Sequence, residues 1–183
     1  QVDGSNLIKP GHHWNDSKNP CYFTTATLKL FNEVQTSEGF TSTNDWSSVI
    51  INSYTYLSNA QSSIGLYPDW TSADINGTAD CGRGCNYSWD ACRTTWRVAW
   101  DYIWYGTSAA KTLSDLTASF APSNPSSVQA IYNINTGSAT ETWNNSAFIG
   151  GFACAYMTDA TRQSVLDSYY STLKGKTETG YYA

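Results

Sequence analysis

Apolar residues recur at helical spacing in six segments of this chain, and this repeated period restricts the fold more than any other feature. In the first segment, Phe23, Ala26, Leu30 and Val34 follow a period of about 3.6 residues, which places them on one helix face. Strand signals are weak, because β-branched residues are scattered and no hairpin dipeptide separates two alternating runs. We therefore predict an all-α domain of about six helices.

Short and long loops alternate between the predicted helices. The second helix follows Asn44 or Asp45 as its N-cap, and the third runs from about Ser88 to Tyr105 and stops at Gly106. Residues 63–85 form a long loop rich in Gly, Asp, Ser and Asn, and a loop of that length is usually functional or disordered. No charge block, linker or repeat divides the chain, so we expect a single domain over residues 1–183. The three remaining helices are expected over residues 107–119, 146–157 and 159–173.

Charged side chains are scarce and aromatic side chains are abundant. Only 14% of the residues are charged, whereas the chain holds 8 Trp and 13 Tyr. Trp and Tyr combine a flat apolar face with a polar tip, which complements the C–H faces and hydroxyl rims of sugars. The net charge of -5 argues against a nucleic-acid partner, because such binding depends on basic contacts to phosphates. No apolar run is long enough to span a membrane, so we expect no membrane partner.

Two of the five cysteines, Cys81 and Cys85, bracket Gly-Arg-Gly in a loop, a spacing that favours a short disulfide. A zinc pair is the alternative, but no second Cys or His pair with metal-ligand spacing follows. His12 and His13 adjoin each other, and consecutive residues rarely chelate one metal. We therefore expect no metal site and no cofactor.

The run from Asn86 to Arg97 places Asp90 three residues before Arg93 among several aromatic rings. If the segment is helical from about Ser88, positions 90, 93 and 97 share one face. A carboxylate held by arginine keeps a low pKa and stays ionised, which suits a sugar-binding cleft. The alternative is a buried Asp–Arg pair that only orients a helix.

Several blocks carry a family resemblance. They are Leu7-Ile-Lys-Pro-Gly11 followed by Trp14, Asn19-Pro-Cys-Tyr-Phe23, Gly65-Leu-Tyr-Pro-Asp-Trp70, Tyr87-Ser-Trp-Asp-Ala-Cys-Arg93 with Trp96-Arg97, Asp101-Tyr-Ile-Trp-Tyr-Gly106 and Asn145-Ser-Ala-Phe148. In order and spacing, and over nearly the whole chain, these blocks resemble glycoside hydrolase family 8. That family contains bacterial endoglucanases, chitosanases, lichenases and some xylanases. The resemblance implies an (α/α)6 barrel, here partial, and an inverting hydrolysis.

The resemblance also implies site residues. Asp90 matches the catalytic base that activates water, Arg93 the arginine that accompanies it, and Tyr22 a tyrosine near the attacking water. Asp69 is expected to act as a turn or N-cap residue rather than in catalysis. By the same likeness, the expected function is inverting endo-β-1,4-glucanase hydrolysis by a secreted, extracellular bacterial protein. The residues expected to bind β-glucan are Trp14, Trp89, which stands where the family usually has tyrosine, and Tyr87.

The chain departs from the family at the proton donor. The family's general acid is a glutamate in a Ser-Glu-Gly-type motif, in a part of the domain that precedes the region matched here. Ser37-Glu38-Gly39 has the same letters but follows the first helix, and Glu141 has no motif around it. The chain therefore resembles the C-terminal half of such a domain, with no identifiable acid.

Two further hypotheses stand beside the enzyme: a glucan-binding half-barrel without catalysis, and a structural, self-assembling protein. Half a barrel leaves apolar helix faces uncovered, and such faces promote association. All three hypotheses therefore predict an oligomer or a missing N-terminal segment that completes the barrel. Trp96, Trp100 and Trp104 are expected to be core residues, and Arg97 to pair with Asp101.

Overall fold

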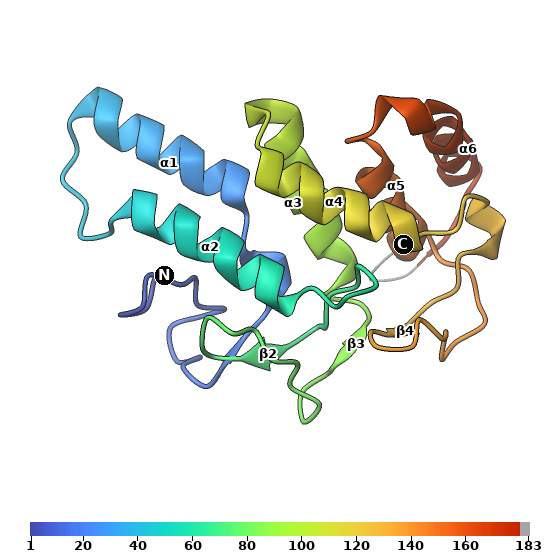
Figure 1. The fold of residues 1–183 in the computed structure, drawn as a ribbon, viewed down its shortest axis with the longest axis horizontal. Coiled ribbons are helices and arrows are strands. Elements are labelled where there is room, and N and C mark those ends of the chain that lie inside the picture. Colours follow the sequence, from blue (N-terminus) through green and yellow to red (C-terminus); the bar gives the residue numbers. More distant parts are fainter. Residues whose placement is uncertain (180–183) are drawn as a thin grey trace.

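The computed structural model describes residues 1–179 and arranges their six α-helices as three hairpins (Figure 1). The first helices of the hairpins contact one another in chain order, α1 with α3 and α3 with α5. This arrangement is part of an (α/α)6-type barrel and confirms the expected all-α class. The hairpins are α1 (Thr25–Glu38) with α2 (Trp46–Ala60), α3 (Cys92–Tyr105) with α4 (Ser108–Phe120), and α5 (Ser146–Tyr156) with α6 (Gln163–Lys174).

The helix ends follow local sequence signals. The side chain of Asp45 accepts a hydrogen bond from the backbone N–H of Ser48 and caps α2, as predicted. Helices α1 and α3 end at Gly39 and Gly106, whose φ angles of 68° and 65° lie in the left-handed region that glycine adopts readily. Two helix starts differ from the prediction: α3 begins at Cys92 rather than near Ser88, because residues 88–91 form a turn, and α6 begins at Gln163 rather than at residue 159, because a 3₁₀ turn precedes it.

Two short antiparallel ladders tie together the loops at the lower side of Figure 1. Strand β1 (Ser17–Lys18) pairs with β2 (Thr71–Ser72), and β3 (Asn86–Tyr87) pairs with β4 (Tyr132–Asn133). Each strand has two residues, so the ladders fix loop positions rather than form a sheet layer. The described residues also form three 3₁₀ turns: η1 (Pro20–Tyr22), η2 (Pro125–Ser127) and η3 (Ala160–Arg162).

Aromatic rings dominate the core between the hairpins. Tyr87 stacks on Phe152 with ring centroids 5.2 Å apart, and Phe23 stacks on Tyr56 at 4.0 Å. Helix α5 approaches α3 closely at Gly151, where an added Cβ would lie 2.6 Å from the carbonyl oxygen of Cys92. A glycine is therefore required at this crossing.

One face of α1 and α3 remains uncovered. The rings of Trp96, Trp100 and Trp104 follow one another along α3, and Trp104 is 55% exposed. The expectation that these tryptophans are core residues is therefore wrong for the described chain. On α1, Leu30 and Val34 are exposed, whereas Phe23 and Ala26, which share their helical period, are buried.

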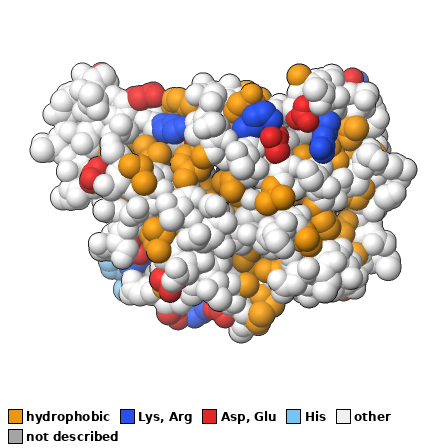
Figure 2. All heavy atoms as spheres, viewed as in Figure 1, with side chains coloured by type: hydrophobic (Ala, Val, Ile, Leu, Met, Phe, Trp, Pro, Cys, Tyr) orange, Lys and Arg blue, Asp and Glu red, His pale blue; other side chains and the backbone are white. Residues whose placement is uncertain are grey.

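Figure 2 shows several separate groups of hydrophobic side chains on one face of the molecule, with few charged side chains between them. An apolar groove of about 440 Å³ lies where α1 and α2 meet their connecting loop, lined by Phe31, Val34, Phe40 and Trp46 among others. Within residues 1–179, no helix has both the length and the apolar character of a membrane span.

Candidate active site

Asp90 and Arg93 form an ion pair at the N-terminal end of α3. Asp90 lies in the turn directly before the helix and Arg93 in the first helical turn, and the Arg93 Nη2 donates to Asp90 Oδ1. Both side chains are partly buried and keep some contact with solvent. An adjacent guanidinium favours the charged form of a carboxylate. The predicted pairing is therefore present, although Asp90 itself precedes the helix.

Tyr22 reaches the same end of α3 from η1, which packs against that helix. Its neighbour Cys21 lies close to two arginines: burial raises the pKa of the Cys21 thiol, and the charges of Arg93 and Arg97 oppose that rise. Tyr22 is exposed and acts electrostatically on Arg97, whose pKa is lowered mainly by burial. The structure thus brings Tyr22, Asp90 and Arg93 to one end of α3.

Arg97 does not pair with Asp101, contrary to expectation. The Asp101 carboxylate accepts hydrogen bonds from Lys29, Tyr54 and Thr107 instead. The guanidinium of Arg97 lies over the ring of Trp96, 4.8 Å from the ring centroid. A spacing of four residues allowed the ion pair, but the aspartate points toward α1 and α2.

Two stacked pairs of indole rings lie on the side of the molecule where α3 begins. Trp14 stacks on Trp70 with centroids 4.9 Å apart, and Trp89 stacks on Trp143 at 5.4 Å. Trp14 and Trp143 are exposed, so each stack presents a ring to solvent. Trp89 is the residue next to Asp90, which places the second stack beside the ion pair. Trp143 was not singled out from the sequence, because no motif surrounds it and its partner comes from a distant segment.

Tyr87 lies apart from these rings, in the core. Its side chain is 0% exposed and packs against Tyr132, Phe148 and Phe152. A fully enclosed ring cannot stack on a sugar. This corrects the expectation that Tyr87 contacts glucan.

Asp69 holds the turn that carries Asp90. One carboxylate oxygen, Oδ1, accepts the backbone N–H groups of Ser88, Asp90 and Ala91 at 3.1, 3.1 and 2.7 Å. Burial raises the pKa of Asp69 to about 6, although these hydrogen bonds and the charge of Arg93 act in the opposite direction. The expectation that Asp69 is a turn residue is confirmed, and its partners are residues of the candidate site.

The predicted disulfide between Cys81 and Cys85 is present and closes the loop that carries Arg83. Arg83 forms an ion pair with Asp16 at 2.5 Å, and its guanidinium lies over the ring of Trp14 at 5.7 Å. The cross-linked loop therefore lies against the Trp14 stack. In the part of the chain described, no cluster of three or more His, Cys, Asp or Glu side chains could hold a metal ion.

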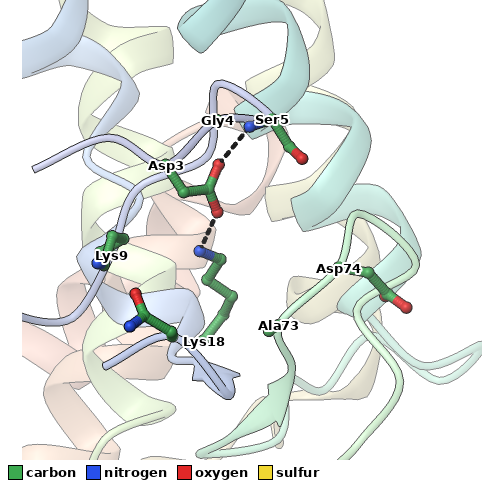
Figure 3. Close-up of a pocket in the computed structure, with 8 residues that line it drawn as sticks. Asp3, Gly4, Ser5, Lys9, Lys18, Ala73 and Asp74 are labelled. Carbon is green, nitrogen blue, oxygen red and sulfur yellow. Dashed lines mark hydrogen bonds and ion pairs between the residues drawn. The ribbon is translucent and has the colours of Figure 1, made fainter. Parts of the chain in front are cut away.

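A separate polar pocket of about 350 Å³ lies near the N-terminus (Figure 3). The ammonium group of Lys18, whose side chain is buried, points to Asp3 and donates to its Oδ2. The other oxygen of Asp3 accepts the backbone N–H groups of Ser5 and Leu7. This pocket has no aromatic lining, so we interpret it as an anchor that fixes the N-terminal loop to β1.

Neither Glu38 nor Glu141 is placed to act as the proton donor of the site in this structure. Glu38 is the last residue of α1, and α1 begins beside η1 and runs away from the site for about 21 Å, since a helix rises about 1.5 Å per residue. Glu141 is exposed and accepts a hydrogen bond from the Trp143 indole N–H at 3.3 Å. Glu141 therefore lies beside the second indole stack, whereas Glu38 does not reach the Asp90–Arg93 pair.

The arrangement of the helical hairpins matches that of a solved glycoside hydrolase. The family description "Glycosyl hydrolases family 8" matches residues 1–183. The chain belongs to this family, as its motifs indicated.

Curated relatives and solved structures agree with this assignment. The chain is 33% identical to Endoglucanase 2 of Ruminiclostridium josui over 183 residues, which cover 98% of the chain and 38% of that protein. It is also 33% identical to Endoglucanase A of Acetivibrio thermocellus, covering 98% of the chain and 37% of that protein. The apo structure of a β-1,3-1,4-glucanase from Paenibacillus sp. X4 superposes with a TM-score of 0.82 at 27% identity, covering 99% of the chain and 52% of that structure. The chain thus spans well under half of the curated relatives and about half of the solved one.

Proposed function

We propose that the protein is an inverting endo-β-1,4-glucanase in which Asp90 is the general base. The observation that supports this most directly is the Asp90–Arg93 ion pair, at the end of α3 to which η1 also brings Tyr22. An inverting base must be ionised so that it can take a proton from water, and the paired arginine favours that state. In such enzymes a second carboxyl group stands roughly 6.5–9.5 Å from the base and protonates the leaving oxygen.

We propose that a segment outside residues 1–183 supplies that proton donor. Glu38 does not reach the site, and Glu141 is an exposed residue of a loop. The chain spans 52% of the solved glucanase chain, which leaves room in a longer protein for a segment that carries the acid. The indole stacks Trp14–Trp70 and Trp89–Trp143 would then hold successive parts of the glucan.

We also propose that further helices of the same barrel cover the exposed face of α1 and α3. Leu30 and Val34 of α1 and Trp104 of α3 are exposed, and exposed apolar surface marks sites where another part of a protein packs. Sedimentation of the protein with and without its preceding segment tests this. The proposal is supported if the protein with the segment is a monomer and the protein without it associates in a concentration-dependent way. Association of both forms through this face would contradict it.

The proposed location is extracellular. The Cys81–Cys85 disulfide supports secretion, because disulfides persist in oxidising compartments. Mass spectrometry of the protein from culture supernatant and from cells, after alkylation of free thiols, measures where the oxidised form accumulates. Finding the protein only in the reduced form inside cells would contradict the proposal.

The test of the base is hydrolysis of mixed-linkage β-glucan by the complete protein and its Asp90→Asn variant. General acid–base groups contribute about 10²–10⁴-fold, so we expect at least a hundredfold loss of reducing-sugar release. Asp167→Asn, on an exposed part of α6, is the matched control and should keep full activity. Newly released ends should have the α-configuration by NMR, because inversion at a β-linkage gives the α-anomer. Undiminished hydrolysis by Asp90→Asn would reject the assignment.

The two indole stacks also support a second candidate, a glucan-binding module without catalysis. Affinity electrophoresis in gels that contain β-glucan separates the two functions. Retardation without turnover, in the complete protein as well as in the shorter chain, would favour the binding module.

A further inference from the structure

Helix α3 lacks a cap of its own. The residue at its N-cap position is Ala91, which makes no side-chain hydrogen bond to the first turn. The first N–H groups of the helix, those of Cys92, Arg93 and Thr94, donate instead to the carbonyl oxygens of residues 88, 90 and 91. The start of α3 therefore depends on how the turn of residues 88–91 is held.

Asp69 holds this turn from a distant part of the chain. Its Oδ1 accepts the N–H groups of Ser88, Asp90 and Ala91, three of the four in the turn before α3. The backbone N–H of Asp69 in turn donates to the carbonyl oxygen of Asn86 at 2.9 Å. Asp69 is therefore bonded both to β3, which precedes the turn, and to the turn itself. The backbone N–H of Asp90 is one of the bonded groups.

The carboxylate of Asp69 is held in a partly buried place. It faces the Arg93 guanidinium and the Cys92 thiol from α3, and the Cys21 thiol from η1. Hydrogen bonds to an ionised acceptor are about twice as strong as neutral ones, so the charge tightens the turn. Burial acts against that charge and raises the pKa of Asp69 to about 6, within the range in which many enzymes work.

We propose that Asp69 is a positioning residue for the proposed base: its carboxylate fixes the turn of residues 88–91 and so directs the side chain of Asp90 toward the attacking water. This inference rests on the proposed function of Asp90. Protonation of Asp69 weakens three hydrogen bonds at once, so the turn loosens on the acid side of about pH 6.

The first test does not depend on catalysis. In ¹H–¹⁵N NMR spectra of the protein from pH 4 to 8, the amides of Ser88, Asp90 and Ala91 should titrate together, with a midpoint near pH 6. The side-chain carboxamide in the Asp69→Asn variant does not titrate, so the pH-dependent shifts of these backbone amides should be lost. Flat amides in the unmodified protein, or an unchanged midpoint in the variant, would overturn the inference.

The second test compares the kinetics of the complete protein on β-glucan. Asp69→Ala should lower kcat by about 10- to 100-fold, since small misplacements of a catalytic group have effects of this size, while KM stays within about twofold. Asp69→Asn keeps an acceptor oxygen and should restore part of kcat, with the acid limb of kcat/KM moved to lower pH. Asp74→Ala removes a comparable carboxylate from an exposed turn, where Asp74 accepts the N–H of Asn76 at 3.0 Å, and should leave kcat unchanged.

The two proposals fail in different ways. Loss of activity in Asp90→Asn together with normal kcat and a normal pH profile in Asp69→Ala would overturn only the positioning role. Full activity in Asp90→Asn would reject the base, whereas the NMR titration would still report whether Asp69 holds the turn.

Discussion

Asp101 is a buried carboxylate on which four segments converge, and its loss should be costly to stability. The side chain is 0% exposed, and its Oδ1 accepts the Lys29 ammonium at 2.7 Å and the Thr107 hydroxyl at 2.8 Å. The Tyr54 hydroxyl donates to the other oxygen. These contacts join α3 to α1, to α2 and to the start of α4.

The variant Asp101→Asn keeps the shape and removes the charge, which leaves the ammonium of Lys29 without its counterion. Breaking a buried ion pair costs about 3–5 kcal/mol. The Lys29 side chain is 19% exposed and an amide oxygen still accepts, so we expect about 3 kcal/mol, the lower end of that range. For a domain of this size, that corresponds to a thermal midpoint about 6–12 °C lower.

Urea unfolding followed by far-UV circular dichroism at pH 7 measures this difference. The matched control is Asp115→Asn, because Lys111–Asp115 is also a Lys–Asp pair but its side chains are 36% and 42% exposed. An exposed pair contributes roughly 0–1 kcal/mol, so the control should change stability little. A loss below about 1 kcal/mol in Asp101→Asn, or an equal loss in the control, would refute the reasoning from burial.

The pH dependence gives the same argument a second check. Burial alone would raise the pKa of Asp101, but its hydrogen bonds, led by that from Lys29, lower the pKa below its ordinary value. A depressed folded-state pKa contributes stability above the unfolded value of about 3.9, which is lost as the pH falls through the folded value. The difference between the two proteins should therefore shrink toward pH 3. A difference that is constant from pH 7 to pH 3 would contradict the linkage.

Two further substitutions test packing and binding. Gly151→Ala should destabilise the protein by about 1–3 kcal/mol in urea unfolding, because the added Cβ meets the Cys92 carbonyl oxygen; Gly150→Ala, with nothing within 4 Å, should not. Equal effects would contradict the close approach of α5. Trp14→Ala should weaken retardation by β-glucan about 2- to 12-fold, from about 0.5–1.5 kcal/mol of ring stacking. Trp104 is an exposed indole near the C-terminal end of α3, away from the candidate site, so Trp104→Ala should bind normally. The reverse pattern would place the glucan elsewhere.

The elements that sequence reasoning found are those encoded by neighbouring residues. A few adjacent positions determine three such features: the end of α3 at Gly106, the N-cap of α2 at Asp45 and the Cys81–Cys85 disulfide. The Asp90–Arg93 pair is similarly local, since three residues separate its members.

The features that sequence reasoning missed depend on partners far away in the chain. Helical spacing shows that Trp96 and Trp104 share a face, but it does not show which face the other helices cover. Tyr87 is buried because Phe152 of α5 stacks on it, and no signal near Tyr87 announces that contact. Asp69 was recognised as a turn residue, yet the turn that it holds lies about twenty residues further on.

The order of the hairpins along the chain is also their order in space, with α1 beside α3 and α3 beside α5. Each hairpin therefore packs first on itself and then on the hairpin made just before it. The contacts within each hairpin are local in the sequence, which favours fast folding. During synthesis from the N-terminus, every hairpin that leaves the ribosome meets a neighbour that is already complete. The barrel wall can thus grow one hairpin at a time, in the direction in which the chain is made.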